Sequence, residues 1–134
     1  IPKVQKKAQD ILSALACPEG ELSITVMDDA AIARINETYL GHPGPTNVIS
    51  FSMREGDYGE INPELIGDVG ISMDTCVREA LQADLAVEQR FDELLIHGIL
   101  HLFGYDHVHD ETQARVMEAK SAELLVLIGW EPDR

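Results

Sequence analysis

The strongest constraint on the fold is a run of apolar residues from Leu94 to Phe103 that is interrupted by only two histidines and a glycine. Apolar side chains occupy all sides of the helix that this run predicts, so the rest of the protein must surround the helix. Gly104 follows the run and can end the helix in the left-handed conformation that glycine favours. We therefore expect a central, buried helix over residues 86–103.

The only polar side chains in this run are His97 and His101, which lie one helical turn apart. Side chains four residues apart share one helix face, with Cβ atoms about 5–6 Å apart. A buried polar group without a partner costs about 1–3 kcal/mol, and a shared metal ion supplies both imidazoles with a partner. Because Gly104 lets the chain reverse, His107 can return to the same ion, and three protein ligands leave a fourth position for water, as in catalytic zinc sites. We predict one Zn²⁺ per chain on His97, His101 and His107.

The polar residues around this motif do not identify a catalytic base. The alternative to metal binding is a pair of core histidines bonded to backbone carbonyls. Asp106 either orients a ligand, accepts a proton or has a structural role. Asn47 and Asp68 either approach the site from the strands or make ordinary hydrogen bonds at strand ends. His109 is expected to be a solvated loop residue, with competition for the metal as the alternative, and His42 is expected to be a bystander in a turn.

Periodicity along the rest of the chain predicts helices and strands in a mixed order. The expected elements begin with a helix from Val4 to Leu15, a strand from Glu21 to Met27, and a helix that Asp28 or Asp29 caps and that carries Ile32, Ile35 and Tyr39. Strands over 47–52 and 65–72 follow, and then a helix that Asp74 caps and that runs towards Ala83. The central helix comes next, and a last helix starts at Asp110 and carries Leu127. This order indicates an α+β fold in a single domain of residues 1–134. We expect a small mixed sheet of about three to four strands packed with about five helices, including a zincin-like central helix that carries two His ligands.

Charge and composition exclude several classes of partner. The net charge of −14 repels nucleic acid at long range, so we expect no DNA binding, and any RNA contact needs a local site or a partner protein. Lys3, Lys6 and Lys7 share one side of the first helix and are expected to form a solvated face. No segment approaches the roughly 20 apolar residues that cross a bilayer, so no membrane contact is expected. Cys17 and Cys76 are expected to be small apolar residues in a reducing compartment, which, with no export signal, indicates the cytoplasm.

The histidine motif resembles two known signatures. It is similar to the metzincin protease pattern His-Glu-x-x-His-x-x-Gly-x-x-His, but Gly98 stands where those proteases carry the Glu general base, which argues against peptide hydrolysis by that route. With Gly98 in place, residues 97–107 resemble the His-Gly-x-Leu-His-Leu-x-Gly-Tyr-Asp-His signature of the YbeY family of bacterial rRNA maturation factors. Residues 45–51 (Pro-Thr-Asn-Val-Ile-Ser-Phe) and 67–72 (Gly-Asp-Val-Gly-Ile-Ser) also resemble two strands of that family, so the resemblance extends from about Glu21 to Trp130.

The resemblance implies a metal-dependent, single-strand-specific endoribonuclease that acts in 16S rRNA 3′-end maturation, ribosome quality control and late assembly of the small subunit. It also implies zinc on the three histidines, and single-stranded rRNA and the small ribosomal subunit or its associated proteins as partners. The nucleophile is either metal-activated water or the 2′-hydroxyl of RNA. Two alternatives stay open: a metal-dependent hydrolase of another substrate, such as a peptide, and a non-enzymatic ribosome-assembly factor whose metal is structural.

One residue departs from the family pattern. The family often has Arg directly after the Tyr that precedes the Gly/Pro loop, whereas this chain has Leu40 after Tyr39. Arg at this position grips phosphate through two hydrogen bonds, which Leu cannot make, so Arg34 or Arg54 would have to substitute. We further expect the strand over residues 47–51 to be an edge strand that flanks a substrate groove.

Overall fold

A computed structural model describes residues 3–53, 64–105 and 110–131 of the chain. Its elements are α1 (Val4–Ala14), β1 (Glu21–Met27), α2 (Asp29–Ile35), the π-helical turn η1 (Asn36–Leu40), β2 (Val48–Ser52), β3 (Leu65–Ser72), α3 (Met73–Ala83), α4 (Val87–Leu102) and α5 (Glu111–Leu127). The predicted order of helices and strands and the α+β class are therefore confirmed, with η1 as an addition. No helix in this described part of the chain is long and apolar enough to cross a bilayer.

The sheet has three strands in the order β1-β3-β2 and is mixed, as predicted. β1 runs parallel to β3, while β2 runs antiparallel to β3. Val69 in the central strand pairs with Ile24 of β1 on one side and with Ser50 of β2 on the other. Because β3 lies between the other two strands, β2 is an edge of the described sheet, which confirms the expectation for this segment.

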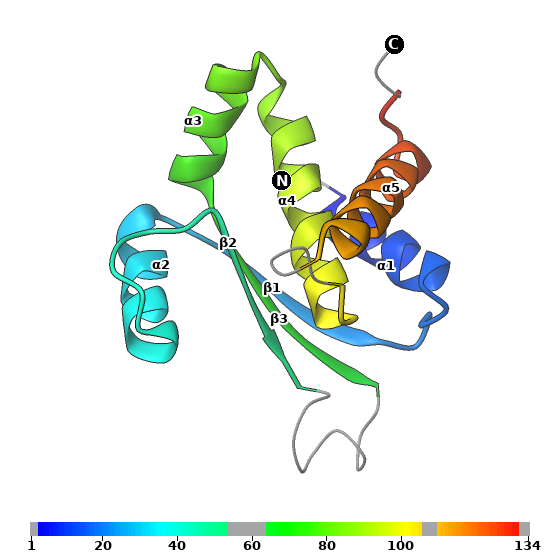
Figure 1. The fold of residues 1–134 in the computed structure, drawn as a ribbon, viewed down its shortest axis with the longest axis horizontal. Helices are drawn as coiled ribbons and strands as arrows, with labels where there is room; N and C mark the ends of the chain where they lie inside the picture. Colours follow the sequence, from blue (N-terminus) through cyan, green and yellow to red (C-terminus); the bar gives the residue numbers. More distant parts are fainter. Residues whose placement is uncertain (1–2, 54–63, 106–109, 132–134) are drawn as a thin grey trace.

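The central helix of the fold is α4. It lies against the sheet on the same side as α1 and α5, while α2 lies on the opposite side of the sheet (Figure 1). Leu95, Ile99 and Leu100 of α4 have no exposed surface, as the apolar run predicted. Each such side chain contributes about 1.5–3 kcal/mol by leaving water, so this helix provides much of the core. Cys76 packs in the same core, and burial raises the pKa of its thiol, in agreement with its expected apolar role.

The predicted helix from Asp29 to Tyr39 is not a regular α-helix to its end. It changes to a π-helical turn at Asn36, and the wider turn rotates the following residues off the apolar stripe that begins with Ile32. Tyr39 lies in this turn and is 70% exposed. Its ring contacts Phe51 edge to face, with centroids 5.8 Å apart.

Helix starts follow the expected chemistry, with one correction. Asp28 caps α2 and Asp110 caps α5, because each carboxylate accepts a hydrogen bond from a backbone N–H of the first turn. The residue that caps α3 is Ser72 rather than Asp74, since the Ser72 hydroxyl accepts the N–H of Thr75 at 3.3 Å.

A buried ionic cluster joins three distant segments of the chain. Lys7 is only 9% exposed, and its Nζ donates to Asp92 Oδ2 at 2.7 Å and to Glu88 Oε1 at 2.9 Å. Trp130 Nε1 donates to the same Asp92 oxygen at 2.7 Å, which ties the segment after α5 to α1 and α4. Burial alone would lower the pKa of Lys7, but the hydrogen bonds with Asp92 and Glu88 outweigh it and raise the pKa above its ordinary value. The expectation that Lys7 belongs to a solvated face was wrong.

We predict that Lys7→Met lowers the free energy of unfolding by about 3 kcal/mol, because it leaves the fully buried Asp92 carboxylate without its cation. Lys6→Met is the matched control: Lys6 is exposed and pairs with Asp10 on its own helix, so loss of this pair costs at most about 0.5 kcal/mol. Urea denaturation of both variants measures the difference. Equal losses in the two variants would contradict the assignment of the buried cluster.

A second polar cluster links the start of α2 to the start of α3. The Asp29 carboxylate accepts hydrogen bonds from the hydroxyls of Ser72 and Thr75 and, at 2.8 Å, from Arg78 Nη2. These bonds, with that from Ser72 the largest contributor, lower the pKa of Asp29 from 3.8 to about 2. The ionised form is therefore the one that stabilises the folded chain.

We predict that Asp29→Asn destabilises the protein at neutral pH and that the difference from wild type shrinks in acid. A lowered folded-state pKa contributes stability that is complete above the unfolded value of 3.8 and is lost as the pH falls towards about 2. Denaturation at several pH values between neutral and acid measures this trend. A gap between the two proteins that stays constant with pH would argue against the carboxylate network.

Candidate active site

The helical spacing of α4 brings the two predicted metal ligands of this helix together. The Nε2 atoms of His97 and His101 lie 3.0 Å apart, and the ring planes meet at 70°. Two nitrogens that bind one zinc ion at about 2.0–2.1 Å in tetrahedral geometry lie about 3.3 Å apart. The observed separation fits two ligands of one cation, and it also fits an N–H···N hydrogen bond between the rings.

The third predicted ligand, His107, lies outside the described residues, as do Asp106, His109 and Arg54. Within residues 3–53, 64–105 and 110–131, no three His, Cys, Asp or Glu side chains are placed to hold a metal ion. Gly104 does adopt the expected left-handed conformation just after α4, with φ of 90°. The structure therefore brings together two of the three predicted ligands, and the part of His107 stays a prediction.

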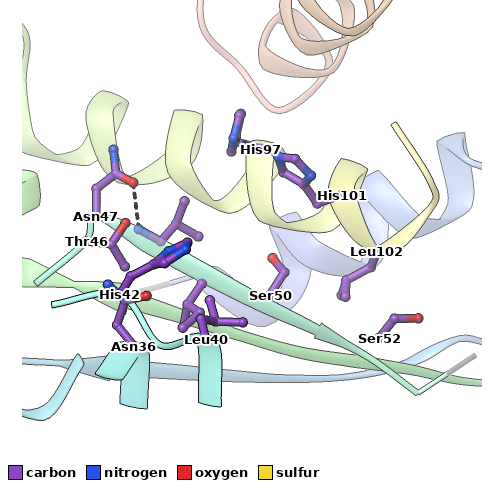
Figure 2. Close-up of a pocket in the computed structure, with 12 residues that line it drawn as sticks. Asn36, Leu40, His42, Thr46, Asn47, Ser50, Ser52, His97, His101 and Leu102 are labelled. Carbon is purple, nitrogen blue, oxygen red and sulfur yellow. Dashed lines mark hydrogen bonds between the residues drawn. The ribbon is translucent and has the colours of Figure 1, made fainter. Parts of the chain in front are cut away.

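Both histidines open into a groove of about 470 Å³ along the edge of β2, a volume within the range of ligand-binding sites. α4 forms one wall, and the segment from η1 to β2 forms the other (Figure 2). The described lining residues are Asn36, Leu40, His42, Thr46, Asn47, Val48, Ile49, Ser50, Ser52, His97, His101 and Leu102. The predicted edge-strand groove is thus present, with the histidine pair inside it.

The charge of this groove differs from that of the whole chain. The chain has 24 acidic residues and a net charge of −14, yet none of the described lining residues has a carboxylate. Three of them are histidines, and several others carry hydroxyl or amide groups. An anionic ligand therefore meets less repulsion in the groove than over an average part of this surface.

The two candidates from the strand ends have different positions. Asn47 lines the groove, but its Oδ1 accepts the N–H of Val48 at 2.7 Å and its Nδ2 donates to Glu79 at 3.2 Å, so its side chain makes the expected strand-end hydrogen bonds. Arg90 in turn donates to Glu79 at 2.9 Å and fixes this carboxylate. Asp68 is exposed in β3 and is absent from the described lining of the groove, so it does not approach the histidines.

Gly98 places α4 directly against the sheet. A Cβ atom at this position would lie 2.7 Å from Val69 Cγ1 and 3.1 Å from Val48 Cγ2, so only glycine allows this approach. Ser50 Oγ donates to the Gly98 carbonyl at 2.9 Å and links β2 to the helix between the two histidines. The Glu that metzincins carry at this position has no space here, which explains why this chain has Gly98 instead.

Two residues of this groove had no predicted role in it. Ser50 bonds to Gly98 across 48 positions of the sequence, and no local pattern links the two residues. His42, expected as a bystander in a turn, does lie in a turn and lines the wall opposite α4 (Figure 2). Leu40 also lines the groove, and no arginine occurs among the described lining residues.

We predict that Gly98→Ala lowers the free energy of unfolding by about 1–2 kcal/mol through overpacking, although alanine favours helix formation by about 1 kcal/mol. Val69→Ala removes the nearest atom, so the double variant should lose less stability than the sum of the two single variants, by more than about 0.5 kcal/mol. Chemical denaturation of all four proteins measures this coupling. Additive losses, or a more stable Gly98→Ala, would refute the close contact.

Comparisons with known proteins agree with this fold. The solution structure of TM1509 from Thermotoga maritima superposes with a TM-score of 0.66 over 92% of this chain and 77% of that one, at 21% sequence identity, which shows a shared fold. The family model of endoribonuclease YbeY matches residues 1–129.

Curated relatives extend over nearly the whole chain. The endoribonuclease YbeY of Geobacter sulfurreducens is 50% identical over 94% of this chain and 85% of its own length. The protein of the same name from Geobacter metallireducens is 48% identical over 97% of this chain and 87% of its own length. A third, from Syntrophotalea carbinolica, is 49% identical over 98% of this chain and 88% of its own length. The chain therefore belongs to the endoribonuclease YbeY family.

Proposed function

We propose that this protein is a zinc-dependent endoribonuclease that cuts single-stranded RNA, with the 3′ end of 16S rRNA as its substrate in the cytoplasm. The observation that carries the proposal is the groove beside β2, where two imidazoles converge and no described lining residue has a carboxylate. Membership of a family named for endoribonuclease activity supports the reaction class.

The donor set of the site fits zinc. Imidazole nitrogens are ordinary zinc ligands, and His97 and His101 present theirs 3.0 Å apart from a rigid, buried helix. With His107 as the predicted third ligand, the site would keep one coordination position open. Zinc bound there would supply a Lewis acid for a phosphoryl oxygen and lower the pKa of coordinated water.

The protein contributes a fixed position for the two imidazoles. α4 is held by its buried apolar face, by close contact at Gly98 and by the hydrogen bond from Ser50 to the Gly98 carbonyl. A site on a helix that packs this tightly cannot shift far from its working geometry. The hydrogen bond from Ser50 also fixes the position of β2 along α4, beside the histidines. The same contact therefore helps to form the proposed substrate groove.

We infer that the substrate is one strand of RNA rather than a duplex. Proteins that act on single-stranded RNA contact unstacked bases and the backbone, which a paired helix does not present in this way. Thr46 presents a hydroxyl group in the groove, and Leu40 offers an apolar surface in place of an arginine. Because the net charge of −14 opposes RNA binding elsewhere, we expect the small ribosomal subunit or its proteins to help recruit the enzyme.

We predict that the protein purified without added metal contains about one zinc per chain and cuts single-stranded RNA, and that a chelator abolishes the cleavage. His101→Ala should lose both zinc and cleavage, because two remaining imidazoles hold the ion poorly. His109→Ala is the comparison variant: as a solvated loop residue His109 should be dispensable, so this variant should keep the zinc and the cleavage, whereas loss of zinc would assign it the alternative role of a competing ligand. Elemental analysis and cleavage of a labelled oligoribonucleotide measure these outcomes.

Cleavage of RNA that survives both chelation and His101→Ala would refute the proposed mechanism. A protein that cuts peptides but not RNA would instead be a hydrolase of the alternative class. A zinc-loaded protein without hydrolytic activity, whose histidine variants unfold, would be an assembly factor with a structural metal.

A further inference from the structure

We propose that His42 is a substrate-binding residue, which contacts a phosphate of the RNA strand from the wall of the groove opposite His97 and His101. This inference rests on the proposed function and extends it to a residue outside the metal site. It starts from the position of the imidazole: His42 lines the same groove as the histidine pair but comes from the loop after η1 (Figure 2).

The loop that carries His42 is held in place by a buried side chain. Asn36 is 6% exposed; its backbone carbonyl accepts the N–H of His42 at 3.3 Å, and its side-chain Nδ2 donates to the Gly44 carbonyl at 3.0 Å. Glu37 Oε1 accepts the N–H of Gly44 at 3.3 Å. The turn is thus fastened at two points to η1, so the backbone that carries His42 is preorganised beside the groove.

The backbone of this loop is specialised. η1 is a π-helical turn, a rare structure that is frequent at functional sites, and it ends at Gly41 with φ of 68°. Gly44 has φ of 84°, which is also left-handed. These two glycines turn the chain sharply on either side of the short segment that bears His42 and bring this segment to the groove wall.

The chemistry of the groove gives His42 a distinct role. RNA phosphate needs hydrogen-bond donors, and the described lining contains no lysine or arginine. His97 and His101 direct their Nε2 atoms towards each other, as ligands of a shared ion would. Of the described lining residues, His42 is then the imidazole that is available for the substrate, and its N–H groups are suitable donors to a phosphate oxygen.

A phosphate contact of this kind affects binding of the substrate more than the chemical step. We expect His42→Ala to raise KM for a single-stranded oligoribonucleotide about tenfold, which corresponds to the loss of one hydrogen bond to a charged group, and to leave kcat within about twofold. His42→Lys should restore KM to within about threefold, because an ammonium group also binds phosphate. The zinc content should equal that of wild type in both variants.

The experiment uses the full zinc-loaded chain, with Lys6→Ala as the control for removing an exposed cation far from the groove. Lys6 is on α1 and pairs with Asp10, so this variant should keep the wild-type KM. An unchanged KM in His42→Ala, or a loss of zinc from this variant, would overturn the inference and leave the proposed function intact.

A second measurement separates the inference from the proposed function. If wild type does not cut RNA, the proposed function fails, and fluorescence anisotropy with the same oligoribonucleotide then decides the role of His42. Binding about tenfold weaker in His42→Ala than in wild type would support the phosphate contact. Equal affinities of the two proteins would overturn it.

Discussion

The contact between α4 and the sheet at Gly98 is the constraint on which the rest of the site depends. Because no side chain separates the helix from Val48 and Val69, the helix lies close to β2, and Ser50 can reach the Gly98 carbonyl. The histidines before and after this glycine are thereby fixed beside the edge of the strand. The same contact therefore builds the core, positions the candidate ligands and forms the groove.

The distribution of charge sets this groove apart from most of the surface. Acidic residues outnumber basic ones by 24 to 10, and the carboxylates of Asp29, Glu88 and Asp92 form hydrogen bonds with lysine, arginine or hydroxyl partners outside the groove lining. Glu79 accepts hydrogen bonds from Arg90 and from Asn47, which does line the groove. The described lining instead offers imidazoles, hydroxyls and amides. A polyanion that is repelled by most of the surface can approach there, which reconciles a net charge of −14 with an RNA substrate.

Local patterns in the sequence predicted most elements, because hydrophobic periodicity and capping residues act over a few neighbouring positions. The bounds of β1 and β3, the buried character of α4 and the pairing of His97 with His101 all follow from such patterns. Features set by distant residues were missed. Lys7 is buried because it pairs with Asp92, which lies 85 positions away in the sequence, and Ser50 bonds to the Gly98 carbonyl across 48 positions.

The proposed site has three imidazoles, those of His97, His101 and the predicted ligand His107, that share one zinc ion beside an open coordination position. X-ray absorption spectroscopy at the zinc edge, on protein purified without added metal, tests this claim directly. We expect nitrogen and oxygen neighbours only, at about 2.0–2.1 Å, with three imidazoles and one exchangeable water. Sulfur neighbours, a fourth protein ligand in place of water, or protein without zinc would contradict it.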